Sequence, residues 1–159
     1  MSVAFTREED HEAQAANLPD RPISPHPNLV TPQGMAQIEA ELASAQAAYA
    51  DAQTAGDVSA DRTAMARSTR DLRYWSARRG SAQLIEPHTP DGRVAFGGAA
   101  TIERDDGRTQ TFRIVGEDEA DPAKGSVSYV SPLARALLGK GVGDVVTVVG
   151  GEVEIITVG

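Results

Sequence analysis

Two stretches with helical periodicity, separated by a short polar segment, limit what this chain can fold into. Thr31 and Pro32 predict the start of the first helix, because threonine caps helices and proline suits the first helical position. After them, the steps between apolar residues alternate between three and four, the rhythm of a coiled coil. These apolar residues are Met35, Ile38, Leu42, Ala45, Tyr49 and Ala52.

The second stretch follows residues 54–63 and is expected to pair with the first in an antiparallel hairpin. In such a hairpin, the residue numbers of facing positions have a constant sum. The sum is 117 for the following pairs: Ala52 with Met65, Tyr49 with Ser68, Ala45 with Leu72, Leu42 with Trp75 and Met35 with Ala82. This register predicts a fold-back point between Val58 and Ser59, and Pro87 and Pro90 are expected to end the second helix.

The charges of the two stretches favour the same pairing. The first carries three acidic residues and no basic one, whereas the second carries six arginines and, beyond the tip, only Asp71 as an acid. Each arm of about 26 residues would span roughly 39 Å. Ile38 faces Arg79 in this register, so the predicted seam is imperfect near its base.

From Arg93 onward the periodicity changes from helical to strand-like. Residues 93–104 and 109–116 predict two strands joined by a turn at Asp106-Gly107, and residues 126–130 predict a third. A short helix is expected between the cap Ser131 and Gly139, followed by a final hairpin that turns at Gly150-Gly151. The chain as a whole is therefore predicted to be α+β, with a helical hairpin before a small twisted antiparallel sheet that carries one short helix.

Composition narrows the function classes. The 159 residues include no cysteine, which excludes disulfides and thiolate metal sites, and three isolated histidines do not suggest a zinc site. The formal net charge of −8 argues against direct binding to nucleic acid. Neither a membrane span nor a secretory signal is visible, so a cytoplasmic protein is expected. Residues 1–27, acidic and rich in proline, are predicted to be an unstructured tail.

Several motifs resemble those of the bacterial Gre transcription elongation factors. RIVGEDEAD, VSYVSPLARALLGKGVGDVV and GGEVEIITV are similar to the C-terminal domain of these factors, and LVTPQGMAQIEAEL is similar to the start of their coiled coil. The resemblance covers residues 28–158 approximately. It implies a coiled-coil hairpin over residues 28–87, with its tip near 56–61, and an FKBP-like domain over 88–159 that lacks prolyl isomerase activity.

The resemblance also implies a partner and a role. In the family, the C-terminal domain docks at the secondary channel of RNA polymerase, and the coiled coil brings acidic side chains to the polymerase active centre. There they help to hold Mg²⁺, so that the polymerase itself cleaves backtracked RNA. The chain is accordingly expected to be a monomeric accessory factor without a cofactor of its own, which meets nucleic acid only within the polymerase complex.

The residues expected to carry this role lie in two places. Asp57 and Asp61, at the tip, are the candidates for assisting cleavage and for sharing Mg²⁺ with the polymerase. The candidates for docking are Ser131, Pro132, Arg135 and Lys140. Leu133, Leu137 and Leu138 are expected instead to pack the short helix on the sheet.

The tip departs from the family pattern Gly-Asp-Leu-x-Glu-Asn. Gly56 and Asp57 match it, whereas Ala60 stands at the glutamate position and Asp61 at the asparagine position. Both arms are also about one heptad, roughly 10 Å of helix, shorter than in the cleavage factors. Two other hypotheses therefore stay open. One is a non-cleaving secondary-channel regulator that competes with Gre factors, similar to the regulator of nucleoside diphosphate kinase. The other is an interaction module whose tip has no chemical role.

Overall fold

The computed structural model describes residues 18–54 and 58–159, with the side chains of 58–61 left out of that description. The chain forms two compact units. One contains the segment up to Pro25 together with Ile38–Ser81, and the other contains His26–Gln37 together with Ala82–Gly159. The first unit is helical and the second is built on a β-sheet, so the predicted α+β class is confirmed.

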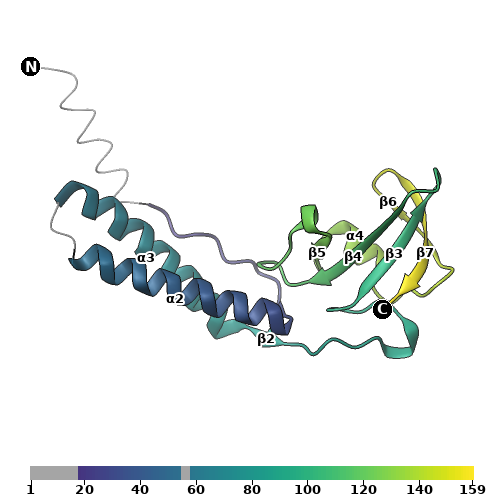
Figure 1. Cartoon of the computed structure of the whole chain (residues 1–159), viewed down its shortest axis with the longest axis horizontal. Coiled ribbons are helices and arrows are strands. Elements are labelled where there is room, and N and C mark those ends of the chain that lie inside the picture. Colours follow the sequence, from purple (N-terminus) through teal and green to yellow (C-terminus); the bar gives the residue numbers. More distant parts are fainter. Residues whose placement is uncertain (1–17, 55–57) are drawn as a thin grey trace, which may run out of the picture. The chain divides into compact units, whose positions relative to one another are not determined.

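The helical unit is an antiparallel hairpin. Its helices, α2 (Pro32–Thr54) and α3 (Val58–Ser81), run side by side in Figure 1, and Arg79 Nε on α3 lies 3.1 Å from Glu39 Oε1 on α2. Five buried residues recur at intervals of seven: Ile38, Ala45 and Ala52 on α2, and Ser68 and Trp75 on α3. Gly34 and Arg78 are also buried but lie outside this repeat. This spacing confirms the predicted coiled-coil pattern. Three of the five are Ala or Ser, so the seam buries little apolar surface.

The ends of the second helix differ from the prediction. Val58 and Ser59 already belong to α3, so the predicted fold-back point between them is wrong. The helix ends at Ser81, well before Pro87, because strand β2 (Gln83–Leu84) pairs there in parallel with β1 (Leu29–Val30). Gly80, which has low helix propensity, weakens the last turn of α3, and the backbone then pairs with β1 as a strand.

The second unit contains a five-stranded sheet in the order β5-β4-β3-β7-β6. Its strands are β3 (Ala99–Arg104), β4 (Thr109–Val115), β5 (Ser126–Ser128), β6 (Val145–Val148) and β7 (Gly151–Val158). Helix α4 (Pro132–Leu137) contacts β5 and β6 (Figure 1). Two single turns of 3-10 helix, η1 (Pro90–Gly92) and η2 (Pro122–Lys124), lie in the connections. The core consists of Val94, Ala100, Ile102, Ile114, Val127, Ala134, Leu137, Val146, Val153 and Ile155.

The sheet differs from the sequence prediction at two points. Residues 93–98 form no regular strand, because the chain turns at Gly97, whose φ is 83°, before β3 begins. Strand β5 runs parallel to β4, while the three other pairs of this sheet are antiparallel. The predicted turn at Asp106-Gly107 is confirmed. There the Arg108 backbone N–H donates to Asp106 Oδ1 at 3.0 Å and lowers the pKa of that carboxyl group.

The segment His26–Gln37, which we call the root segment, ties the start of α2 into the sheet unit. Asn28, Val30 and Thr31 are buried. The Asn28 carbonyl accepts a hydrogen bond from the Gln83 N–H at 2.8 Å, and the Val30 carbonyl accepts one from the Ile85 N–H at 2.9 Å. Gly116, just after β4, lies so close to the root segment that an added Cβ would stand 2.3 Å from the Leu29 carbonyl oxygen. A side chain at position 116 is therefore incompatible with this packing.

We expect Gly116→Ala to destabilise the sheet unit by about 1–3 kcal/mol, since the root segment must move to relieve the overlap. The measurement is the free energy of unfolding from urea denaturation followed by circular dichroism. Gly80→Ala is the matched control. No atom lies within 4 Å of a Cβ at this helical position, so the free energy of unfolding should stay equal or rise. Equal stability of Gly116→Ala and the wild type would contradict the close packing.

Candidate functional site

The tip of the hairpin holds the residues that the sequence singled out for chemistry. Asp57 lies outside the described residues and immediately precedes α3. Asp61 belongs to the first turn of α3, and its side chain is not among those described. The backbone thus places one candidate within a helix and the other at the position before it. Because helix N-termini carry partial positive charge, acidic residues at these positions favour helix formation.

The length of the hairpin follows directly from its helices. α2 contains 23 residues and α3 contains 24, which corresponds to about 35 Å each at the usual rise per residue. Both helices are therefore shorter than the 26 residues expected from the sequence. The two helices are almost equal in length, so they can pair along their whole length as an antiparallel hairpin.

Thr31 fixes the base of the hairpin. It is fully buried, and its Oγ1 accepts a hydrogen bond from the Gly34 N–H at 3.0 Å, while Met35 N donates to the Thr31 carbonyl at 2.9 Å. These bonds confirm the predicted N-cap of α2. The same hydroxyl donates to Glu119 Oε2 at 2.6 Å, so one side chain both caps the helix and joins it to the loop after β4.

A second pair of contacts surrounds this cap. Arg113 on β4 donates through Nη2 to Gln33 Oε1 at 2.7 Å, and its Nη1 lies 3.7 Å from Glu119 Oε1. Only 12% of the Glu119 side chain is exposed, which strengthens its hydrogen bonds relative to those on an open surface. The sequence analysis missed this network. The sequence gives no clear signal of it, because an acidic run such as 117–119 is equally typical of a solvent-exposed loop.

The docking candidates gather around α4. Ser131 caps this helix, since its Oγ accepts from the Ala134 N–H at 3.2 Å, and Pro132 occupies the first turn. Leu137 is fully buried and Leu133 and Leu138 pack partly against the core, as expected. Pro132, Arg135 and Lys140 are exposed. The Ser131 hydroxyl is therefore used in capping the helix. Pro132, Arg135 and Lys140 form an exposed surface with two positive charges.

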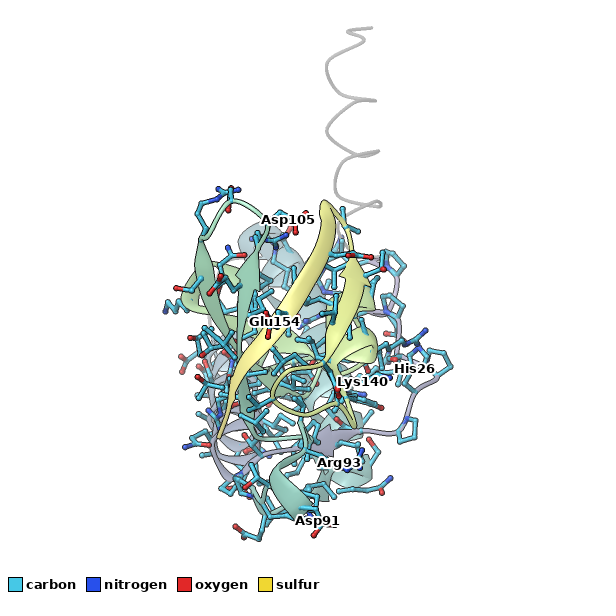
Figure 2. All side chains as sticks on the ribbon, turned by 90° about the vertical axis from the view of Figure 1, so that its right-hand side faces the viewer. His26, Asp91, Arg93, Asp105, Lys140 and Glu154 are labelled. Carbon is cyan, nitrogen blue, oxygen red and sulfur yellow. The ribbon has the colours of Figure 1, made fainter. Side chains whose placement is uncertain are left out.

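Arg93 supports this surface and was not identified from the sequence. Its Nη1 donates to the Gly139 carbonyl at 3.0 Å, and the neighbouring Val94 N–H donates to the Lys140 carbonyl at 2.8 Å. Figure 2 labels Arg93 and Lys140 on these adjoining segments. Val142, two residues after Lys140, is 65% exposed. The candidate docking surface therefore combines cations with an exposed apolar side chain.

An acidic pocket on the sheet is a separate feature. It is lined by Glu103, Arg104, Asp105, Val145, Glu152, Val153 and Glu154, of which Figure 2 labels Asp105 and Glu154. Across the described part of the chain, no three acidic or histidine side chains are grouped in a way that would hold a metal ion. Within the same residues, no helix has the length and apolar character of a membrane span.

Comparisons with known proteins give a consistent result. The family model described as "Transcription elongation factor, GreA/GreB, C-term" matches residues 89–159. The transcription elongation factor GreA of Psychrobacter arcticus is 39% identical over 132 residues, which cover 72% of this chain and 84% of that protein. The GreA of Ralstonia nicotianae is 51% identical over 79 residues, 46% of this chain, and the match spans half of that protein's length.

Solved structures show a more distant similarity. GreA factor homolog 1 of Thermus thermophilus shares 20% sequence identity with the chain and has a TM-score of 0.39. The alignment covers 84% of this chain and 99% of that one.

We expect Thr31→Ala to lower the free energy of unfolding by about 0.5–2 kcal/mol, because it removes both the N-cap and the partner of Glu119. Urea denaturation followed by circular dichroism measures this change. Thr54→Ala is the matched control at the other end of α2. There the exposed hydroxyl bonds only to the Asp51 carbonyl, so its removal should change stability little. A smaller effect for Thr31→Ala than for Thr54→Ala would contradict the proposed importance of the cap.

Proposed function

Because the chain belongs to the GreA/GreB family of transcription elongation factors, we propose that it binds RNA polymerase at the secondary channel and stimulates cleavage of backtracked RNA. In this proposal the polymerase performs the cleavage, and the chain assists it from outside without turnover of its own. The observation that carries the proposal is a narrow helical hairpin whose tip contains two acidic residues and whose root segment is built into a separate sheet domain.

The shape of the hairpin supports entry into a confined channel. Three of the five buried seam positions hold Ala or Ser, which lets the two helices pack closely, so the hairpin is thin for its length of about 35 Å. Paired helices also bend less than a loop of the same reach. A thin and stiff element is suited to carrying a side chain into a site that a globular domain cannot enter.

The chemistry of the tip supports its role in catalysis. Asp57 and Asp61 supply carboxylate oxygens, the ligand type that Mg²⁺ prefers, and the second Mg²⁺ of a nuclease site helps to stabilise the attacking and leaving oxygens. In the proposal, these two residues add negative charge close to the metal of the polymerase. Arg62, the next residue after Asp61, partly offsets that charge.

The surface around α4 is the proposed docking site for the polymerase. Pro132, Arg135, Lys140 and Val142 are exposed there, and the Ser131 cap and the Arg93 hydrogen bond fix the backbone that carries them. A fixed backbone lowers the entropy cost of binding, and a cationic surface attracts an acidic partner. We therefore propose an acidic surface of the polymerase as the partner of Arg135 and Lys140.

The length of the helices favours a second candidate function. The helices contain 23 and 24 residues, and the arms are about one heptad, roughly 10 Å, shorter than in the cleavage factors that the chain resembles. Metal positioning tolerates errors of well under 1 Å. A hairpin that stops short of the metal would occupy the channel without assisting cleavage. In that case the chain would act as a regulator that competes with cleavage factors for the same site.

Transcript cleavage distinguishes the two functions. With a backtracked polymerase complex and Mg²⁺, we expect the wild type to accelerate RNA 3′-end shortening, and Asp57→Asn to reduce that acceleration at least about 10-fold without loss of binding. Asp61→Asn tests the second acid, and Glu41→Gln, an exposed change near the middle of α2 and far from the tip, is the matched control. Binding without shortening, together with inhibition of an added cleavage factor, would support the competing regulator instead.

Docking is tested separately by charge reversal. We expect Arg135→Glu combined with Lys140→Glu to weaken binding to the polymerase at least about 10-fold at low salt, since both cations turn into repulsive charges. Lys124→Glu reverses an exposed cation elsewhere in the same unit and should leave binding unchanged. Pull-down or fluorescence anisotropy with purified polymerase measures the affinity, and equal loss with Lys124→Glu would show a general charge effect.

A further inference from the structure

The segment of residues 18–25, which we call the clasp, contacts α3 although its composition predicts an unstructured tail. Asp20 Oδ1 lies 3.1 Å from Arg73 Nη1, and Arg21 Nη1 lies 3.6 Å from Asp71 Oδ1. The two ion pairs have opposite polarity, with the acid on the clasp in one and on the helix in the other. Such an alternation aligns the clasp in a single register along α3.

Arg21 also contacts the aromatic residues of α3. Its guanidinium carbon lies 3.8 Å from the centre of the Tyr74 ring and 5.3 Å from that of Trp75. The two rings form an edge-to-face pair with centroids 4.9 Å apart. A planar guanidinium stacks on such rings more favourably than a lysine ammonium does. Arg21 therefore binds a built surface that comprises an acid and two aromatic rings.

We propose that residues 18–25 act as a reversible clasp, which covers the Tyr74–Trp75 surface of α3 and uncovers it when it opens. The surface would then be occupied by this chain's own Asp20-Arg21 pair in the closed state. The proposal concerns the helical unit alone and stands or falls independently of the function proposed above.

The strength of the contacts explains why the clasp is reversible. Arg21 and Asp71 each keep 37% of their side chains exposed, and Asp20 and Arg73 keep 62% and 66%. Ion pairs at such exposures contribute little each, and Asp71 is also shared with Arg70 at 3.4 Å. The stacking of Arg21 on two aromatic rings adds a contribution of at least similar size. Loss of that stacking should open the clasp without unfolding the hairpin.

The sequence provides a specific probe, because Trp75 is the sole tryptophan of the chain. In the whole chain of 159 residues, we expect Arg21→Ala to raise the fraction of open clasp about two- to five-fold, the change that loss of a surface cation–π contact produces. The readout is a larger acrylamide quenching constant for Trp75 fluorescence. Arg21→Lys keeps the charge but not the planar stacking, and it should give an intermediate quenching constant.

Arg67→Ala is the matched control, since it removes an exposed arginine of the same helix and should leave Trp75 quenching unchanged. Circular dichroism of each variant reports the helical content. Quenching of Arg21→Ala equal to that of the wild type would overturn the proposal. Loss of helical signal in Arg21→Ala would overturn it as well, because the segment would then be a fixed part of the hairpin and not a reversible clasp.

Discussion

The hydrogen bonds of the Thr31 hydroxyl are the interaction on which the start of α2 depends. This buried group accepts from the Gly34 N–H and donates to Glu119, so it joins the first turn of α2 to the loop after β4. A buried hydroxyl that lost either bond would leave a polar atom unsatisfied, which is costly in a protein interior. The close approach of Gly116 to Leu29 depends on the same placement of the root segment.

The two units differ in how they are stabilised. The sheet unit has a continuous core of aliphatic residues from all five strands of its larger sheet and from α4. The hairpin buries only Ile38 and Trp75 as large apolar side chains of its described seam, whose other buried positions are Ala or Ser, and Leu42 and Tyr49 remain half-buried. Contacts outside the seam, such as Arg79 with Glu39 and Arg21 with Tyr74, therefore contribute a larger share of its stability. The arginines of α3 and the acids that pair with them therefore help to stabilise the hairpin, although they lie on its surface.

The sequence predicted the fold well where the signals were local. Heptad spacing placed Ile38, Ala45 and Ala52 on one face of a helix, and turn residues marked Asp106-Gly107 correctly. The sequence did not reveal features that arise from tertiary contacts. The pairing of β1 with β2 was missed because each strand contains two residues, too few for a periodicity to show. The contact of Arg21 with Trp75 was missed because the two residues lie more than 50 positions apart. The chemical role of Asp57 and Asp61 remains a prediction, because it depends on a partner's active centre that this chain does not contain.

The pairing of β1 with β2 has a consequence for how this protein varies. Leu29 lies beside Gln83, so the polypeptide leaves the sheet unit and returns to it through neighbouring strands. Everything between them is topologically an insertion, and equal numbers of heptads can be gained or lost from its two arms without disturbing the strands that anchor it. The length of the hairpin can thus be changed, by evolution or in engineered chimaeras, without changing the sheet unit that anchors it.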